Sequence, residues 1–291
     1  MATVGQWIEG ARPRTLPAAL SPVLAGSATA WFSGGFHLGK AFLAFLVALA
    51  LQIGVNYAND YSDGIRGTDE DRVGPMRLVG SHVATPKAVK TAAFSCFGLA
   101  AVAGLALIVW TGHWWLVAVG IACIVAAWFY TGGEHPYGYA GLGEVFVFIF
   151  FGLVAVCGTT YVQLGRVIWA TLLASIAIGA IACQILVANN LRDIIGDGEV
   201  GKRTLATRLG DAGTRRFFVA LGGVAVLCLV GVAALTTWWA LLSLVGLVFL
   251  VPATRTVTGG AQGPRLIAVL KQTGFAELAV SAGLFIGCTL G

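Results

Sequence analysis

Long apolar runs without a charged side chain alternate with short polar segments along most of the chain. A helix needs about 20 apolar residues to cross the hydrocarbon core of a bilayer, so each run predicts at least one spanning helix. Two runs are long enough for two helices each, and they divide at the aromatic turns TGHWW and TTWW. The runs are 15–39, 41–59, 91–133, 145–165, 167–191, 217–254 and, interrupted only by Glu277, 272–291. The pattern predicts an all-α membrane protein of nine transmembrane helices, forming one integral-membrane domain over residues 1–291.

The composition also indicates a chain embedded in lipid. Of the 291 residues, 58% are hydrophobic and 11% are charged, whereas a soluble protein carries about 25% charged residues. One core cannot bury so much apolar surface, so we expect the lipid bilayer to solvate much of it. The six cysteines are scattered through the apolar runs without metal-site spacing, which is typical of small buried side chains.

The distribution of basic residues predicts the orientation in the membrane. With nine spans, the N-terminus and the even-numbered connections lie on one side, and that side receives sixteen of the 18 Lys and Arg residues. The other side receives only Lys40 and Arg166. Because basic residues concentrate on the cytoplasmic side, we expect the N-terminus and the long polar connections to face the cytoplasm from the cell membrane. The pI near 9.0 then follows from the topology, and no nucleic-acid partner is predicted.

Two acidic clusters stand at the ends of apolar runs, and the spacing of each places its members on one face of a helix. The first is Asn56, Asn59, Asp60 and Asp63, and the second is Asn189, Arg192, Asp193 and Asp197. Ionised carboxylates at a membrane helix end are costly unless something compensates them, and four aspartates on facing helices would repel each other. A divalent cation removes both costs. Oxygen ligands suit Mg²⁺, which bridges carboxylates to substrate phosphates.

Basic residues follow each acidic cluster. They are Arg66, Arg72 and Arg77 after the first cluster, and Lys202 and Arg203 after the second. Acidic groups that hold Mg²⁺ beside basic groups that bind phosphate oxygens describe a diphosphate site. The alternative is a set of solvated loop charges with Asn or Asp side chains capping helix ends. Two clusters of the same kind, each with basic residues beside it, favour the metal–diphosphate site.

The same segments resemble a known family. NDYSDGIRGTD and NNLRDIIGDGEVGKRT resemble the two Asp-rich motifs of the UbiA superfamily of intramembrane prenyltransferases. GARPRTLPAALSPVLAGSA, NYANDYSDGIRGTDEDRVGPMR and YTGGEHPYGYAGLGEVFVFIFFG are similar to the 1,4-dihydroxy-2-naphthoate branch, which serves menaquinone biosynthesis. The similarity covers most of the chain, from residue 7 to about residue 210. It implies nine helices around a central cavity, with Mg²⁺ as cofactor and a polyprenyl diphosphate bound at the cytoplasmic end.

The resemblance also implies roles for particular residues. The implied metal ligands are Asn56, Asp60, Asp63, Asn189, Asp193 and Asp197, and the four aspartates among them are the expected catalytic residues. The implied diphosphate-binding residues are Arg66, Arg72, Arg77, Lys202, Arg203, Asn56 and Asn189. Gly67 stands where the wider superfamily often has another aspartate, and Asp69 follows two residues later, as in the naphthoate branch.

The implied reaction transfers the polyprenyl group to 1,4-dihydroxy-2-naphthoate with loss of CO₂ and diphosphate, giving demethylmenaquinol. Neutralising the leaving group promotes ionisation of an allylic diphosphate, and aromatic faces steady the resulting cation. Candidates for binding the acceptor are Arg12, Tyr130, Tyr137 and Tyr139, with Arg14 and His135 as further candidates for its carboxylate. Most phenylalanines of VFVFIFFG (145–152) are interpreted as packing residues, and Glu144 as a helix cap. Glu277 is either functional or extended toward the cytoplasmic face.

Two other classes of membrane protein fit the sequence less well. A transporter or channel would spread acidic residues at mid-span over several helices, whereas here they cluster near one end. DYSDG resembles the opening of the CDP-alcohol phosphotransferase motif, but the rest of that motif is missing and nine spans are too many. Within the superfamily, 4-hydroxybenzoate, homogentisate or chlorophyllide acceptors stay open.

Overall fold

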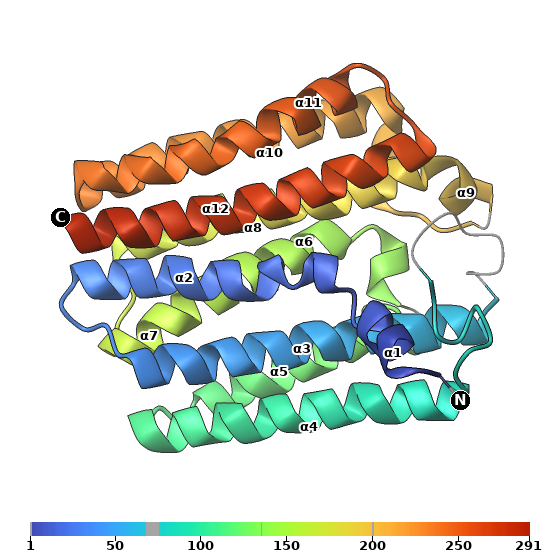
Figure 1. Cartoon of the computed structure of the whole chain (residues 1–291), viewed down its shortest axis with the longest axis horizontal. Coiled ribbons are helices and arrows are strands. Elements are labelled where there is room, and N and C mark those ends of the chain that lie inside the picture. Colours follow the sequence, from blue (N-terminus) through green and yellow to red (C-terminus); the bar gives the residue numbers. More distant parts are fainter. Residues whose placement is uncertain (1, 68–75, 135, 200) are drawn as a thin grey trace.

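The computed structural model describes residues 2–67, 76–134, 136–199 and 201–291, and its long helices run side by side along one axis (Figure 1). The long helices are α2 (Pro17–Phe32), α3 (Leu38–Ile65), α4 (Pro86–Thr111), α5 (Leu116–Phe129), α8 (Trp169–Arg192), α10 (Leu205–Leu235) and α12 (Ile267–Leu290). Of these, α10 is kinked at Gly210, where the backbone is not helical. Two further rods are composite: α6 (Gly143–Val147), the π-helix η3 (Phe148–Cys157) and α7 (Gly158–Leu164) form one, and the 3₁₀-helix η4 (Trp238–Phe249) and α11 (Leu250–Thr258) form the other. The short elements are α1 (Val4–Gly10), η1 (Pro13–Thr15), η2 (Tyr137–Ala140), α9 (Ile194–Glu199) and η5 (Gly263–Leu266).

The helices divide where the apolar pattern predicts. The run 91–133 divides at TGHWW into α4 and α5, and the run 217–254 divides at TTWW into α10 and η4. In the described part of the chain, seven helical segments are long and apolar enough to cross a membrane. The helices α2 and α5, of 16 and 14 residues, are shorter than the ~20 residues of a typical span. The all-helical, multi-pass architecture is therefore confirmed, while the number of nine spanning helices stays a prediction.

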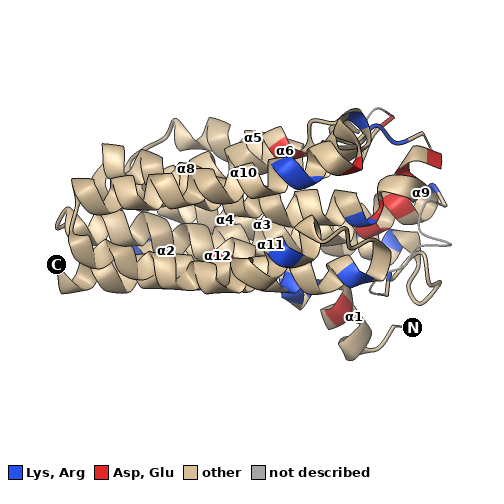
Figure 2. Cartoon of the chain, turned by 90° about the horizontal axis from the view of Figure 1, so that it is seen from above, with Lys and Arg blue, Asp and Glu red and all other residues tan. Residues whose placement is uncertain are grey.

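Charged side chains gather at one end of the helix bundle. Figure 2 shows most Lys, Arg, Asp and Glu residues at the end that also carries α1 and α9, while the C-terminus lies at the opposite end. The helices α3 and α8 both finish at the charged end, and α12 starts there. Because α3 and α8 carry the two acidic clusters near their last turns, this arrangement brings both clusters to the same end of the bundle.

Small residues allow the helices around α8 to approach closely. Ala174, Ala177 and Ala180 of α8 are fully buried in a core cluster with residues of α2, α10 and α12. A Cβ atom added to Gly152 of η3 would lie only 2.7 Å from the Cα atom of Gly179 of α8. Only glycine permits this approach, as is common where membrane helices pack. The packing makes α8 a rigid support for the polar residues at its end.

The carboxyl group of Glu277 lies inside the bundle. Its side chain, on α12, is 0% exposed, and neither carboxylate oxygen has a hydrogen-bond partner among the described residues. The sequence left open that Glu277 extends to the charged end, and the structure shows that it does not.

We expect Glu277→Gln to stabilise the folded protein, because a buried carboxylate without a partner costs free energy and an amide of the same size carries no charge. The expected gain is about 1–3 kcal/mol, measured as a rise in Tm of the purified protein in detergent. Glu199→Gln changes an exposed carboxylate of α9 and should leave Tm unchanged. A lower Tm for Glu277→Gln would mean that the carboxylate is stabilised by a group it contacts.

Candidate active site

A cavity of about 780 Å³ extends from the charged end of the bundle into its apolar interior. Helices α3 and α8, which carry the two acidic clusters, both contribute polar side chains to its wall. Representative polar lining residues are Asn56, Asn59, Asp63, Asn189, Asn190 and Lys202. Representative apolar lining residues are Val47, Leu51, Gly104, Ile108, Ile124 and Phe150. A polar mouth above an apolar chamber suits a molecule with one charged end and one hydrocarbon end.

The first acidic cluster lies on one face of α3, as its spacing predicts. All four members are buried, with at most 9% of each residue exposed. Asn56 Nδ2 donates hydrogen bonds to Ala11 O and Thr15 Oγ1, both at 3.0 Å. Asn59 Oδ1 accepts a hydrogen bond from Thr131 Oγ1 at 2.7 Å. The two amides therefore fix the segment that follows α1 and the end of α5 against α3.

Asp60 contacts the backbone of the segment that follows the first cluster. Its Oδ2 accepts a hydrogen bond from Leu78 N at 2.7 Å, and its Oδ1 accepts one from Val79 N at 2.9 Å. The residue is 1% exposed and is not part of the cavity wall. In this structure Asp60 holds the segment that carries Arg77, and the direct metal role implied by the resemblance stays a prediction.

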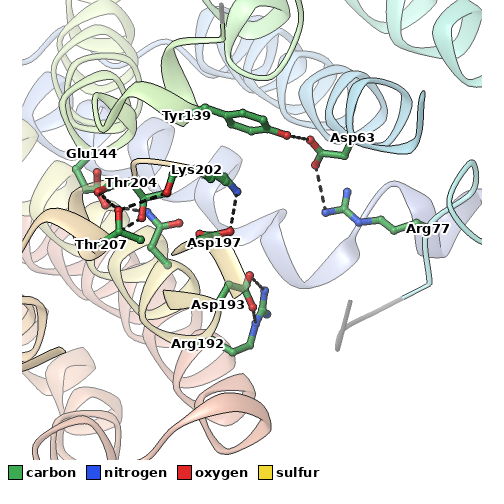
Figure 3. Close-up of polar contacts among 11 residues, drawn as sticks. Asp63, Arg77, Tyr139, Glu144, Arg192, Asp193, Asp197, Lys202, Thr204 and Thr207 are labelled. Atoms are coloured by element: carbon green, nitrogen blue, oxygen red, sulfur yellow. Dashed lines mark hydrogen bonds and ion pairs between the residues drawn. The ribbon is translucent and has the colours of Figure 1, made fainter. Parts of the chain in front are cut away.

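Asp63 lies one turn further along α3, on the cavity wall. Its Oδ1 accepts a hydrogen bond from the Tyr139 hydroxyl at 2.6 Å, and its Oδ2 lies 3.8 Å from a guanidinium nitrogen of Arg77. Both ion-pair partners are largely buried, with 10% and 12% of the side chains exposed. The carboxylate is thus held between a phenol and a cation at the mouth of the cavity (Figure 3).

The second acidic cluster follows the end of α8. Arg192 Nε and a terminal guanidinium nitrogen bind the two carboxylate oxygens of Asp193 at 2.6 and 2.5 Å. Asp197 Oδ1 lies 3.3 Å from Lys202 Nζ. The backbone of Lys202 also donates a hydrogen bond to the Asp197 carbonyl at 2.8 Å, which folds the chain after α9 back onto the cluster.

Tyr139 joins the two acidic clusters. Its hydroxyl donates to Asp63 of the first cluster, while Lys202 Nζ, the partner of Asp197, lies 4.9 Å from the centre of its ring. The Tyr139 carbonyl accepts a hydrogen bond from Arg203 N at 3.1 Å. The sequence predicted Tyr139 only as an acceptor-binding residue. The structure adds that it connects Asp63, near the end of α3, with Lys202, which pairs with Asp197 of α9 (Figure 3).

Some of the residues predicted to bind diphosphate line the cavity and others do not. Arg77, Lys202 and Asn189 line the cavity together with Asn56. Arg66 instead donates hydrogen bonds to the carbonyls of Thr131 and Gly133, and Arg203 is exposed away from the cavity wall. Arg72, Asp69 and His135 lie outside the described residues.

The donor atoms at the cavity mouth fit magnesium better than a softer metal. They are carboxylate and amide oxygens, the ligands that Mg²⁺ prefers, whereas zinc sites usually contain His or Cys. Within residues 2–67, 76–134, 136–199 and 201–291, no group of three or more His, Cys, Asp and Glu side chains is gathered closely enough to bind one ion. Asp63, Asp193 and Asp197 are instead turned toward Arg77, Arg192 and Lys202. The predicted set of six ligands therefore stays a prediction.

Aromatic rings form one wall of the cavity. Tyr130 and Tyr137 are in edge contact, Tyr137 stacks on Phe146 with ring centres 3.9 Å apart, and Phe146 stacks on Phe150. Because Phe146, Phe150 and Phe151 all line the cavity, the interpretation of most phenylalanines in this run as packing residues was wrong. Burial raises the pKa of both tyrosines, with the Glu144 carboxylate adding to the rise at Tyr130. Both phenols therefore stay protonated at neutral pH.

Asn190 is a cavity residue that was not among the predicted site residues. Its Nδ2 donates a hydrogen bond to Oε1 of Glu144 at 2.9 Å, across the contact between α8 and α6. Glu144 lies in the first turn of α6, where the sequence predicts a capping side chain, and it is 5% exposed. The sequence feature that could have indicated Asn190 is the pair Asn189–Asn190 at a membrane helix end. Two adjacent residues of a helix point to different faces, so the pair supplies an amide to each of two neighbours.

The helices, the one-sided charge and the amphipathic cavity define a multi-pass membrane protein whose cavity suits a molecule with a polar head and an apolar tail. The UbiA prenyltransferase family model matches residues 19–264. The 1,4-dihydroxy-2-naphthoate octaprenyltransferase of Mycobacterium tuberculosis is 53% identical over 99% of both chains, and that of Escherichia coli is 38% identical over 96% of this chain and 95% of its own. The chain belongs to the UbiA prenyltransferase family.

A solved structure has the same fold. A UbiA homolog from Archaeoglobus fulgidus bound to GPP and Mg²⁺ superposes with a TM-score of 0.69, covering 97% of this chain and 99% of its own. Its sequence identity is 14%, so this similarity concerns the fold alone.

Proposed function

We propose that the protein transfers a polyprenyl group from a polyprenyl diphosphate to 1,4-dihydroxy-2-naphthoate, releasing CO₂ and diphosphate and giving demethylmenaquinol. The observation that carries the proposal is a cavity whose mouth is lined by Asn56 and Asp63 of α3 and by Asn189 and Asn190 of α8, above an aromatic and apolar chamber. The relatives at 53% and 38% identity, both 1,4-dihydroxy-2-naphthoate octaprenyltransferases, support this acceptor.

Magnesium is the proposed cofactor. The side chains that would hold it are Asp63 and the amide oxygens of Asn56 and Asn189, all on the cavity wall. Asp193 and Asp197 are not on the wall but bind Arg192 and Lys202, which are, and they would complete the oxygen-only donor set. The archaeal homolog that binds GPP and Mg²⁺ has the same fold, which supports a similar site here. When bound, the metal would neutralise the negative charge that develops on the diphosphate leaving group.

The protein's own cations assist the same step. Arg77 and Lys202 contact carboxylates at the cavity mouth, and both can turn to phosphate oxygens when a diphosphate arrives. Tyr139 keeps the two sides of the mouth together through Asp63 and Lys202. This arrangement places positive charge where the leaving group develops negative charge. Such electrostatic stabilisation is usually the largest single contribution to catalysis.

The remaining steps take place in the apolar chamber. The allylic C–O bond breaks, and its electron pair leaves with the diphosphate oxygen. The ring carbon that bears the acceptor carboxylate attacks the allylic cation, and the bond to the carboxylate then breaks, so that its electron pair restores the aromatic ring as CO₂ leaves. Tyr137, Phe146 and Phe150 form a continuous aromatic surface that shields the cation from water.

The orientation and the number of spans belong to the same proposal. We infer that the charged end faces the cytoplasm, because most basic residues gather there. We further infer that α2 and α5 are the two remaining spans of the nine. Because both helices are short, the residues that flank them would lie in the membrane interface. A single domain is supported by the cavity wall, which draws on residues from Glu9 to Gly274.

A panel of acceptors tests the function. Membranes containing the protein should prenylate 1,4-dihydroxy-2-naphthoate in preference to 4-hydroxybenzoate and homogentisate with one polyprenyl diphosphate as donor. Excess EDTA should abolish the product, and added Mg²⁺ should restore it. Preference for another acceptor would overturn the naphthoate assignment, and full activity in EDTA would overturn the metal role.

A further inference from the structure

The side chain of Asn190 presents only one of its two polar atoms to the cavity. Asn190 lies near the end of α8, on the cavity wall, and only 6% of the residue is exposed. Its Nδ2 donates the 2.9 Å hydrogen bond to Oε1 of Glu144, a residue behind the cavity wall. Within the described part of the chain, its Oδ1 has no hydrogen-bond donor, and protein atoms do not enclose it. The amide oxygen therefore faces the open cavity.

Glu144 determines which polar atom of Asn190 faces the cavity. An amide can turn over and exchange its oxygen and nitrogen, but an ionised carboxylate only accepts hydrogen bonds. Glu144 Oε1 therefore holds Nδ2 on the side of α6 and leaves Oδ1 on the side of the cavity. Glu144 is 5% exposed, and it lies in the first turn of α6, where the helix dipole favours negative charge.

An amide oxygen held in this orientation recognises one kind of ligand group. It accepts a hydrogen bond from an O–H or N–H group, whereas its partial negative charge disfavours a carboxylate or a diphosphate. The Glu144 carboxylate behind Asn190 adds to that repulsion. Arg12 and Arg14, which the sequence predicts as partners of the acceptor carboxylate, line the same cavity and stay candidates for that anion. Asn190 therefore suits a hydroxyl group of a substrate rather than one of its anionic groups.

The Asn190 amide lies at the same end of the cavity as the aromatic wall. Glu144 and Phe146, a member of the stacked aromatic surface, belong to the same short helix α6. A Cβ atom added to Gly143, the residue before Glu144, would lie 3.5 Å from the hydroxyl oxygen of Tyr130. An aromatic molecule that binds Asn190 through a hydroxyl group therefore brings its ring to the surface that shields the allylic cation.

We propose that Asn190, oriented by Glu144, accepts a hydrogen bond from the 4-hydroxyl group of 1,4-dihydroxy-2-naphthoate. This inference rests on the proposed function. In that acceptor the 1-hydroxyl group is adjacent to the carboxylate and donates to it within the molecule, so the 4-hydroxyl group needs a partner from the protein. A site that pairs with a substrate hydroxyl group discriminates against analogues that lack it. Asn190 is thus a specificity-determining residue, and Glu144 is a positioning residue that acts through it.

Kinetics with two acceptors test the contact, because 1-hydroxy-2-naphthoate lacks only the 4-hydroxyl group. Asn190→Leu should lower kcat/KM for 1,4-dihydroxy-2-naphthoate about tenfold, since it removes one hydrogen bond and leaves a hydroxyl group unpaired. It should not lower kcat/KM for 1-hydroxy-2-naphthoate, which makes no such contact, and KM for the polyprenyl diphosphate should not change. Gln262→Leu removes an exposed amide before η5 and is the matched control, with the ratio of the two acceptors unchanged.

Variants of Glu144 test the positioning role. Glu144→Leu frees the Asn190 amide to turn over, so it should also reduce the preference for the acceptor with the 4-hydroxyl group. Adding Asn190→Leu to that variant should reduce the preference no further, because both changes act through one contact. Glu144→Gln keeps an oxygen for Nδ2 and should keep the preference. If Glu144→Leu lowers turnover of both acceptors alike, its role is structural and the positioning role is wrong.

Equilibrium binding separates this inference from the proposed reaction. Without metal or donor, and without air, the purified protein should bind 1,4-dihydroxy-2-naphthoate more tightly than 1-hydroxy-2-naphthoate, and Asn190→Leu should remove that preference. This result in a protein that makes no prenylated naphthoate would support the hydroxyl site and overturn the proposed function. An unchanged preference in an active Asn190→Leu enzyme would overturn the site and leave the function intact. An unchanged preference together with a higher Mg²⁺ requirement would also overturn the site, because it would place Oδ1 on the metal.

Discussion

Asp63→Asn should lower kcat by about 10³-fold or more, because the change removes one of the charges that compensate Mg²⁺ at the diphosphate. Asp63 lies on the cavity wall, where its two oxygens face Tyr139 and Arg77. An asparagine of the same size still accepts the hydrogen bond from Tyr139, so the folded structure should persist. Product formation in membranes and the Tm of the metal-free protein together measure the two expectations.

Glu199→Gln is the matched control for Asp63→Asn. Glu199 is an exposed carboxylate of α9, close in sequence to Asp197 but outside the cavity wall. Neutralising it lowers the negative charge of the same region by the same amount, and activity should stay within about twofold because an exposed charge is largely screened. Removal of a metal ligand should leave less than about a tenth of the activity. If Asp63→Asn keeps more than that, the metal does not bind at this mouth.

The apolar pattern predicted the helices well because lipid leaves few alternatives. Backbone polar groups must be satisfied inside each spanning segment, so a run such as 167–191 can only become the helix α8. The breaks at TGHWW and TTWW were equally clear, since aromatic and glycine-containing turns divide runs that are too long for one span. The same pattern could not predict that 148–157 forms a π-helix, because α and π geometries differ in hydrogen-bond register and not in hydrophobicity.

The site was predictable at the level of helix faces and not at the level of contacts. Helical spacing placed Asn56, Asn59, Asp60 and Asp63 on one buried face of α3, and the structure confirms it. The spacing did not reveal which of these side chains face the cavity. Asp63 does, while Asp60, three residues earlier, faces the backbone of Leu78 and Val79. That difference depends on where the backbone of Leu78 and Val79 lies after the loop that follows α3, which the helical periodicity of α3 does not report.

The role of Tyr139 illustrates the same limit. Its sequence context, a tyrosine beside a loop at the charged end, is also typical of a residue that anchors a helix at the membrane interface. Only the three-dimensional contacts with Asp63 and Lys202 identify it as the link between two helix ends that are more than 100 residues apart in the sequence. Arg66 shows the same limit. Its position in the sequence close to Asp63 predicted a diphosphate-binding cation, but its hydrogen bonds to the carbonyls of Thr131 and Gly133 give it a structural role.

Asp60→Asn should reduce activity about 100-fold or more and, unlike Asp63→Asn, should also destabilise the metal-free protein by about 1–3 kcal/mol. The carboxylate accepts hydrogen bonds from two consecutive buried backbone groups, Leu78 N and Val79 N. An asparagine offers only one acceptor oxygen, so one buried N–H group would face the amide nitrogen and lose its partner. The segment after Arg77 would then loosen, and Arg77 would lose its position opposite Asp63.

Two measurements distinguish this positioning role from direct metal binding by Asp60. In the absence of metal, Asp60→Asn should lower Tm by several degrees, and limited proteolysis should cut faster near Ser81 and His82, where the chain turns before α4. Raising the Mg²⁺ concentration should not restore turnover, because the lost contact is to the backbone. If the metal-free Tm instead equals that of the unmodified protein and high Mg²⁺ restores turnover, Asp60 binds the metal directly, as the Asp-rich motif implies, and the contacts to Leu78 and Val79 give way when the ion arrives.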